Sequence, residues 1–589
     1  MTGIQINGQF LQLAANTVAT IRRGNPFLNA EAINGEYSLP VTVVYTESNY
    51  QALQGYFSFL TKKQKLRLPA TFFDGTAFSY KGTLVIESLA SNMNAPQSGR
   101  LTGYFLTGVS AFFSDAKGKL LKDLDWGGVR EFDWTTNLGF DGTGGFWQHC
   151  HETWSNADIP YVFYPIRNDG WGGEGGTVDY MNKLDDSLLQ AVLHIVDNTY
   201  SLCPHLRLVW FLETMFKHFG YTLTGDVLAD ADFQLLTVPT FKAIDWRSPV
   251  FGTFTHIEFD LKDHVPPEWT VTDVMINLWQ MMAITFIFDT ATRTVKLTAL
   301  RDIKAGVKKD WTPYCDANFS SRFTSDPHIY SLKNSIESGD SLPGSALDFT
   351  GAETLPAVYH RRDLPSADAS NIDKYVFVYI ENVWLQCRYD GGYDWIPTSF
   401  NIFSYEPANA TDNFDTKIST LPVLLTTTTY SGNNYYRLYP ACTQEGNWAH
   451  KVQPFKPWGM RLLFYRGMAW DLNVSSGFPS TVGRQYPFAT CGTHGLAYDY
   501  APMGNWGLAY VYSFGGVDKG ILATWFAPWL ALLTNEEIVP VRLYLPRHVL
   551  LDHKADDIIL IRNVPFVAEN MDINLPYPGW VDGELRRMG

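Results

Sequence analysis

The sequence has few charged residues, few cysteines and no long apolar run. Asp, Glu, Lys and Arg make up 18% of the 589 residues, against about 25% in an average soluble protein. So small a charged share favours a large β-rich protein, or one whose surface is largely covered by partners. The six cysteines form no CxxC pair, which excludes a disulfide scaffold and favours a reducing compartment during assembly.

Signals for membranes, targeting and nucleic acid are also missing. No run of about 18 apolar residues occurs, so we predict no membrane-spanning helix. The stretch MTGIQINGQFLQLAANTVATIRRG lacks a basic start followed by an apolar core, so we expect no signal peptide. The net charge is −15. A chain this acidic is not expected to bind nucleic acid through phosphates, because that affinity comes from basic residues that release counterions.

Aromatic residues, in contrast, are abundant, at 15% of the chain with 19 Trp. They suit pleated sheets and also anchor interfaces, so a β core and an interface remain alternative explanations. Leucine, valine and other apolar residues alternate with polar ones over much of the first 130 residues and again near the C-terminus. This alternation predicts strands.

The clearest local pattern lies between residues 254 and 300. Thr270 and Asp273 predict a capping box at the start of a helix. Alternation over 284–288 and again over 294–300 predicts two strands joined by a turn. We therefore expect a buried helix that leads into a β-hairpin, with Leu278 on the buried face. The apolar residues that recur at helical spacing in this helix are Val271, Val274, Met275, Leu278 and Met282.

The predicted fold class is mainly β with an α+β middle. Two small β-barrel-like tube domains flank helix-plus-hairpin domains, and irregular insertions interrupt them. The predicted boundaries are 1–130 for the first β-barrel-like tube domain, 131–185 for an aromatic and Gly-rich insertion, 186–310 for the helix-plus-hairpin α+β domain, 311–450 for a second β region, 451–535 for an irregular insertion and 536–589 for C-terminal strands that complete the second barrel.

The run His149-Cys150-His151-Glu152 contains residue types that bind metals. On a strand, His149 and His151 would point the same way, roughly 6.5 Å apart. A tetrahedral site needs more ligands, and no second cluster has zinc-like spacing. A histidine pair in a loop or an interface is the other interpretation, and whether the pair binds a metal stays open.

Three other patterns resemble chemical motifs but lack their context. Cys491 and His494 carry no recognised nucleophile signature. Gly170–Gly176 is Gly-rich without the strand and helix that a phosphate cradle needs. Paired acids could serve a glycosidase only at a suitable separation in space. We therefore predict no enzyme, no catalytic, cofactor-binding or metal residue, and no cofactor. The acidic pairs are Asp123/Asp125, Asp185/Asp186 and Asp556/Asp557.

Three segments resemble a known family. The helix followed by FIFDTATRTVKL is similar to the helix-plus-hairpin element of baseplate hub proteins from tailed bacteriophages, which are related to the type VI secretion spike. YSLPVTVVYTESN and VPVRLYLPRHVLLDHKADDIILIRNVPFVAEN resemble segments of tail proteins from phages of Bacteroidetes-type hosts. The resemblance covers residues 1–55, 200–305 and 536–587.

This resemblance implies two small β-barrels beside mixed α/β domains, with three chains in a pseudo-sixfold ring that caps the tail tube. The expected function is a structural tail hub or baseplate protein, through which DNA passes and to which the tail tip attaches. Expected partners are two further copies in a homotrimer, the tail tube protein, and distal tail or spike proteins. The expected location is the tail tip of the virion, after assembly in the host cytoplasm.

The alternative function is a glycan- or receptor-binding tail protein, with or without hydrolytic activity. The Trp- and Tyr-rich insertions would then be sugar platforms. The two functions differ in what they demand of basic residues, because only a ring around DNA needs a lining that does not hold phosphates. We expect the main basic cluster to lie away from the channel, at a contact with an acidic neighbour. That cluster is Lys62, Lys63, Lys65 and Arg67, with Arg586 and Arg587 as a smaller terminal pair.

Overall fold

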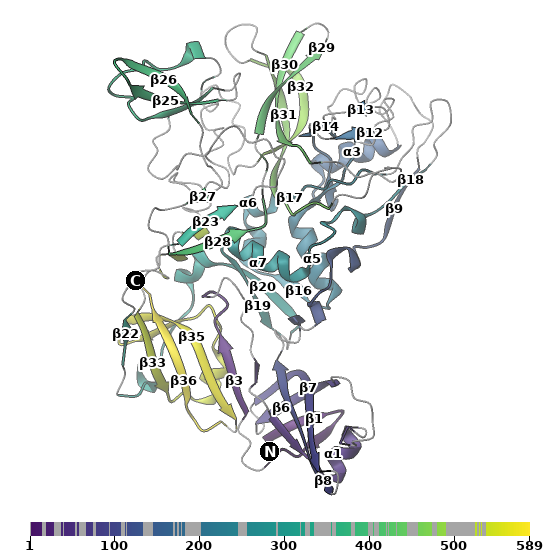
Figure 1. The fold of residues 1–589 in the computed structure, drawn as a ribbon, viewed down its shortest axis with the longest axis vertical. Helices are drawn as coiled ribbons and strands as arrows, with labels where there is room; N and C mark the ends of the chain where they lie inside the picture. Colours follow the sequence, from purple (N-terminus) through teal and green to yellow (C-terminus); the bar gives the residue numbers. More distant parts are fainter. Residues whose placement is uncertain are drawn as a thin grey trace.

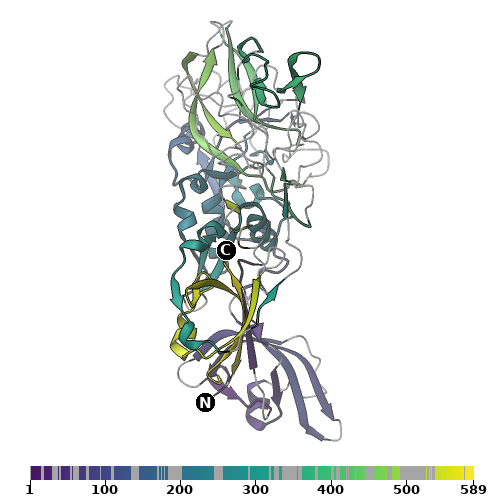
Figure 2. The same ribbon diagram turned by 90° about the vertical axis from the view of Figure 1, so that its left-hand side faces the viewer.

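The computed structural model places two β lobes side by side at one end of an elongated molecule, with helices and short sheets in the middle and longer strands at the other end (Figure 1). The same order along the long axis is visible in the perpendicular view (Figure 2). The structure describes residues 2–14, 19–28, 37–38, 41–53, 56–57, 66–74, 78–92, 95–107, 112–113, 115–133, 145–168, 171–173, 176–177, 180–182, 202–244, 256–289, 292–317, 320–323, 330–334, 355, 358, 361–378, 383–398, 404–405, 411–419, 421, 423–430, 433–444, 457–473, 480–490, 525–526, 529–530, 532, 537–575 and 577–588.

The first lobe is an antiparallel sheet with one short helix. Its first hairpin turns at Asn7 and Gly8, which both have positive φ, as the Asn-Gly pair predicts. Alternate residues such as Ile4, Val41 and Leu84 are fully buried in its core. The elements are β1 (Thr2–Ile6), β2 (Gln9–Leu11), β4 (Tyr37–Ser38), β5 (Val41–Val44), α1 (Glu47–Ala52), β6 (Leu66–Asp74), β7 (Phe78–Asn92) and β8 (Ala95–Thr107).

The second lobe combines the C-terminal strands with short pieces from distant parts of the chain. In the hydrogen-bond order β8-β4-β3-β35-β36-β33-β22, strand β3 joins the two lobes into one sheet path. The predicted mainly β fold is confirmed, but the described strands are not closed into two barrels. The elements are β3 (Ala19–Gly24), β21 (Lys308–Asp310), β22 (Arg322–Phe323), β33 (Glu537–Leu543), α9 (Arg547–Asp552), β34 (Ile558–Ile561), β35 (Val564–Leu575) and β36 (Val581–Arg587).

The middle layer contains the predicted helix and hairpin. Helix α7 begins with the capping box that Thr270 and Asp273 form, and Leu278 is fully buried on its inner face, as expected. The chain leaves the helix through Ala283 in the left-handed conformation and enters β19, which pairs with β20. The elements are η1 (Leu121–Asp123), α5 (Leu208–His218), β16 (Thr222–Thr224), η2 (Asp226–Ala229), α6 (Ala231–Gln234), η3 (Leu261–His264), α7 (Val271–Met282), β19 (Ile284–Asp289), β20 (Thr294–Ala299), η4 (Leu300–Ala305) and η5 (Thr312–Tyr314).

The described parts of the two predicted insertions form regular elements. Residues 145–155 form a helix, and two long strands occupy much of 463–490. Gly467 has φ of 81° at a register shift between Tyr465 and Met468. This bulge interrupts the alternation of period two, which explains why the strand looks irregular in the sequence. The elements here are β9 (Val129–Asp133), α3 (Gly145–Ser155), β10 (Tyr161–Val162), β11 (Ile166–Asn168), β12 (Gly172–Gly173), β13 (Gly176–Thr177), β14 (Tyr180–Met181), β31 (Leu463–Asn473) and β32 (Ser480–Thr490).

The remaining strands complete the middle and the far end. Strand β31 carries the long hairpin β29–β30 and also pairs with β17 near the helices. None of the helices among the described residues has the length and apolar character that a bilayer crossing requires. The elements are β15 (His205–Arg207), β17 (Leu236–Val238), β18 (His256–Asp260), β23 (Tyr330–Asn334), η6 (Arg361–Asp363), β24 (Tyr375–Val378), β25 (Val383–Tyr389), β26 (Tyr393–Thr398), β27 (Ser404–Tyr405), β28 (Asp412–Thr416), β29 (Val423–Tyr430) and β30 (Asn433–Cys442).

The segment that follows β3 runs between the second lobe and the middle layer. Asn25 donates from its side-chain amide to the carbonyls of Ala568 at 2.7 Å and Ala555 at 3.1 Å. The carbonyl of Pro26 accepts from Trp279 Nε1 and from Thr285 Oγ1, both at 3.2 Å. The next carbonyl, of Phe27, accepts from Trp529 Nε1 at 2.7 Å. Three consecutive residues therefore tie the two parts together.

Replacing Leu278 by Ala tests the packing of α7. The change leaves a cavity in a fully buried position, so we expect a loss of about 2–5 kcal/mol in the free energy of unfolding. Denaturant titration followed by tryptophan fluorescence measures it. Gln280→Ala is the control, since Gln280 is only partly buried on the same helix and its loss should shift stability by less than about 1 kcal/mol. Equal midpoints for Leu278→Ala and the parent protein would contradict the packing.

Candidate functional site

His149 and His151 both lie on helix α3, so neither the strand geometry nor a loop describes the pair, and its place in an interface stays a prediction. His149 Nε2 is 2.7 Å from the Tyr161 hydroxyl, and burial lowers the pKa of this histidine. His151 instead stacks on Trp154, with ring centroids 4.2 Å apart. The buried spacing of Phe146, Cys150 and Trp154 is the helical signal that could have found α3.

The structure describes only some of the other chemical motifs that the sequence contains. Gly172–Gly173 pairs with Gly176–Thr177 in a small two-stranded sheet. Asp125 accepts from the backbone N–H of Gly127, as a turn residue does. Among the described residues, no three or more His, Cys, Asp and Glu side chains are placed to hold a metal ion. The remaining predictions lie outside the described residues: Asp185/Asp186, Cys491 with His494, and Lys62, Lys63 and Lys65.

The outer face of the second lobe carries a row of charges across four strands. The register aligns Arg22 of β3 with Asp572 of β35, Asp572 with Asp582 of β36, and Asp582 with Arg542 of β33. The inner face of the same strands is apolar, with Ile573 fully buried. Alternation of side chains across the pleat therefore turns the whole charged row toward solvent.

Each arginine of this row is bound by one carboxylate through two hydrogen bonds. Arg22 donates to Asp572 at 2.7 and 2.6 Å, and Arg542 donates to Asp582 at 2.7 and 3.2 Å. The hydrogen bond to Asp582 raises the pKa of Arg542. Such fork-shaped pairs occupy the donors that would otherwise bind a phosphate. The row carries two positive and two negative charges and is neutral as a unit.

The terminal arginines noted in the sequence are also paired, each through one hydrogen bond. Arg586 Nε lies 3.1 Å from Glu569 Oε2, and Arg587 Nη1 lies 2.7 Å from Glu537 Oε2. Arg587 and Glu537 are out of phase with Asp582 and Arg542 on their strands, so they do not belong to the charged row. We call the two arginine–aspartate pairs of the row the paired-arginine face. Arg67, the described member of the predicted basic cluster, is exposed on β6 of the first lobe, which leaves its relation to any channel a prediction.

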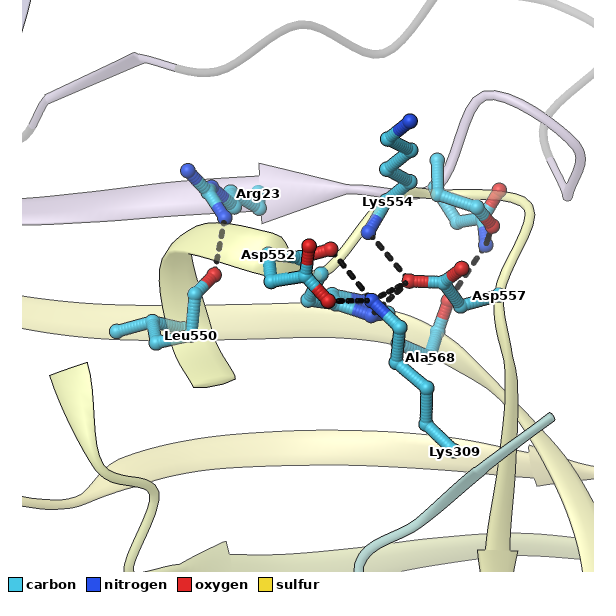
Figure 3. Close-up of polar contacts among 10 residues, drawn as sticks. Arg23, Lys309, Leu550, Asp552, Lys554, Asp557 and Ala568 are labelled. Atoms are coloured by element: carbon cyan, nitrogen blue, oxygen red, sulfur yellow. Dashed lines mark hydrogen bonds and ion pairs between the residues drawn. The ribbon is translucent and has the colours of Figure 1, made fainter. Parts of the chain in front are cut away.

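A lysine of the second lobe binds two aspartates that come much later in the chain (Figure 3). Lys309 Nζ of β21 lies 2.8 Å from Asp552 Oδ2 and 2.7 Å from Asp557 Oδ2. Asp557 also accepts from the backbone N–H of Lys554 at 2.7 Å. Asp556, its predicted acidic partner, pairs separately with Lys296 at 2.7 Å. The two neighbouring aspartates thus act in separate ion pairs that hold the fold.

The surroundings set the charge states at this junction. Burial acts to raise the pKa of Asp557, but hydrogen bonds from His553 and Lys309 outweigh it and leave this pKa below its ordinary value. The hydrogen bond from Lys309 also lowers the pKa of Asp552. Arg23 of β3 reaches the same region and donates to the carbonyl of Leu550 at 3.5 Å, so three distant segments meet here.

Replacing Lys309 by Met removes the shared cation and takes one of its donors from buried Asp557, which keeps the backbone N–H of Lys554. We expect a loss of about 1.5–3 kcal/mol in the free energy of unfolding at neutral pH, the usual contribution of a hydrogen bond to a charged group. Thermal and denaturant unfolding measure the change. Lys308→Met is the matched control, because Lys308 is exposed on the same strand and should behave like the parent.

The same variant predicts a pH dependence. Because the pKa of Asp557 is lowered in the folded state, its stabilisation is present above the ordinary carboxyl pKa of about 4. It is lost as the pH falls through the lowered value, since the unfolded state then binds more protons. The gap between parent and Lys309→Met should therefore narrow in acid. A gap that stays constant down to the acid transition would show that Lys309 stabilises by packing alone.

Comparisons with known proteins give little further information. No family model matches the sequence, and no curated protein matches it. Among solved structures, the chain is similar to the 43 kDa tail protein of prophage MuSo2 from Shewanella oneidensis. The identity is 8% and the TM-score 0.28, over 99% of this chain and 97% of that chain. A likeness at this level carries no argument about fold or function, so the function is argued from the molecule itself.

Proposed function

We propose that the chain is a structural, non-enzymatic protein of a tailed-phage virion: a tail hub that forms a homotrimeric ring at the end of the tail tube. The three segments that resemble hub and tail proteins in sequence support this proposal through their positions. The first lies on β4, β5 and α1 of the first lobe, the second on α7 and its hairpin, and the third on the strands of the second lobe.

The arrangement of the two lobes is the observation that carries the proposal. Both lie at the same end of the molecule (Figure 1), and β3 links them in one hydrogen-bonded path. Two β units per chain give six units when three chains close around an axis, which suits a tube of sixfold symmetry. Closed rings of this kind use head-to-tail interfaces between identical subunits. The tail tube protein and a separate spike or distal protein would then contact opposite sides of the ring.

The pairing of the arginines on the paired-arginine face supports the hypothesis that DNA passes through the ring. A lining that lets a polyanion slide must not offer free cations in a continuous band, because phosphate contacts supply most non-specific affinity. The two arginines of this face are bound by two carboxylates, and Arg586 and Arg587 are bound by Glu569 and Glu537. The two pairs of the face are partly exposed, and such ion pairs add little stability, typically about 0–1 kcal/mol each. We therefore infer that these carboxylates serve to neutralise the arginines more than to stabilise the fold.

The alternative of sugar platforms in the two insertions receives no support from their described tryptophans. Trp154, Trp171 and Trp529 are exposed by 8%, 0% and 1% of their surface. Trp154 and Trp529 also direct their ring N–H groups to backbone carbonyls inside the protein. A platform needs an exposed aromatic face, whereas these side chains build the core.

Locating the chain in the virion tests the proposal. Tails carrying a label at the C-terminus of this chain should show three labels around the axis at the tip in an averaged electron-microscopy map. Labelled tube protein is the control that fixes the axis and the tube end. A map with this chain as a single peripheral appendage would contradict the hub function.

Freeing the arginines tests the charge argument separately. In the double variant Asp572→Asn and Asp582→Asn, Arg22 and Arg542 lose their partners, so we expect the purified protein to bind duplex DNA. Two freed cations per chain predict a slope of about −2 in log K against log salt concentration. The control is Glu258→Gln with Glu268→Gln, which removes the same charge from exposed positions of the middle layer. DNA retention that is equal in both double variants would mean that net charge, and not the pairing, keeps DNA away.

A further inference from the structure

Strands β24, β25 and β26 form a small three-stranded module with a core of its own. The module lies at the end of the molecule away from the two lobes (Figure 1). Trp395 donates from its ring N–H to the carbonyl of Pro365 at 2.9 Å, which fixes the sheet against the segment before it. The buried side chains of this separate core are Val376, Val378, Leu385, Cys387 and Trp395.

Two tyrosines extend the apolar face of this module into solvent. Tyr389 and Tyr393 are directly opposite each other at the end of the β25–β26 hairpin, and their ring centroids are 5.0 Å apart. Tyr389 is 61% exposed and Tyr393 38%. A cross-strand aromatic pair stabilises a hairpin by about 0.5–1.5 kcal/mol. Tyr389 could make this contact with most of its side chain buried, so its pairing with Tyr393 does not explain why it is exposed.

The turn between them provides an acceptor and open space. Asp390 follows Tyr389 directly and is exposed. Asp394 is one position out of phase with Tyr393 and belongs to the opposite face, and its Oδ1 accepts from the backbone N–H of Trp395 at 2.7 Å. Gly391 has φ of 72°, so the turn itself requires glycine there. Gly392 does not have a positive φ, and nothing lies within 4 Å of the position that a Cβ would take. Glycine at 392 is thus not demanded by the fold, and it leaves the backbone uncovered beside the rings.

We propose that this hairpin tip binds a neutral saccharide through Tyr389 and Tyr393. The electron-rich face of a tyrosine attracts the C–H groups on one side of a sugar ring, while Asp390 accepts hydrogen bonds from its hydroxyls. The same carboxylate repels sulfated sugars and uronic acids through like charge, which selects a neutral ligand. The inference does not depend on the ring function, although a site far from the two lobes would remain accessible in a ring.

The size of the patch argues for a saccharide and against a protein partner. The apolar part of the tip consists of two tyrosine rings, and the other exposed apolar residue of the hairpin, Ile396, belongs to the opposite face because it is one position out of phase with Tyr393 and Trp395. A stable protein interface buries about 800 Å² on each partner around a packed apolar centre. A hairpin tip cannot supply that area, but it can hold one or two sugar rings.

A glycan array of neutral and acidic saccharides, probed with the purified full-length chain, tests the proposal. We expect retention of a subset of neutral glycans and none of their sulfated or uronic acid counterparts. Tyr389→Ala should weaken the retained affinity at least about fivefold, or about 1 kcal/mol, because it removes one of the two aromatic faces that the sugar contacts. Tyr389→Phe keeps the aromatic face and should retain most of the binding.

Tyr544→Ala is the matched control, because Tyr544 is 50% exposed on the second lobe and its removal should leave binding unchanged. Tyr389 is mostly in solvent, so its variants should keep the melting temperature of the parent, which is measured alongside. An array that retains no glycan, equal binding by Tyr389→Ala, or a preference for acidic glycans would each overturn the proposal. Neither the subunit number nor the place of the chain in the tail changes with these results, so they leave the hub proposal to its own test.

Discussion

The architecture depends on the way in which residues 25–27 are held. Asn25 is bonded to carbonyls of the second lobe, whereas the carbonyls of Pro26 and Phe27 accept from two tryptophans and a threonine of the middle layer. Phe27 itself is fully buried in the core of that layer. A buried backbone segment has polar groups that must find partners, and here those partners come from both sides. One short stretch of chain therefore sets the position of the second lobe against the helices.

Local chemistry allowed the centre of the fold to be predicted closely. The capping box, the buried face of α7 and the following hairpin depend on residues within a few positions of one another, so the sequence pattern contains them. The bulge at Gly467 concealed β31 because it breaks the alternation on which strand prediction depends. In helix α3 the two histidines stand at alternate positions, as on a strand, whereas the buried residues Phe146, Cys150 and Trp154 recur at the helical period. The domain boundaries stay a prediction.

The candidate sites were less accessible from the sequence, for a physical reason. Arg586 and Arg587 were identified as a basic pair, but their partners Glu569 and Glu537 are set by strand register. Arg22 and Asp572 meet across 550 positions of sequence. Tyr389 and Tyr393 continue the alternation of the buried residues before and after them, so the sequence predicts that they are buried too. Alternation shows which face of a strand a side chain is on, but it does not show where along the strand the core ends.

The pairing of β3 with β35 also orders events during synthesis. The two strands are joined in register although one lies near the start of the chain and the other near its end, and pairings across such separations form late, because the loop between them must first be closed. On a ribosome, β3 has no partner from the second lobe until almost all of the chain has been made. An interrupted chain therefore cannot complete the joined sheet, and it would expose an unpaired edge of β3 that chaperones and proteases recognise. Only a chain that has been synthesised to its end could therefore form the complete sheet and assemble into a larger particle.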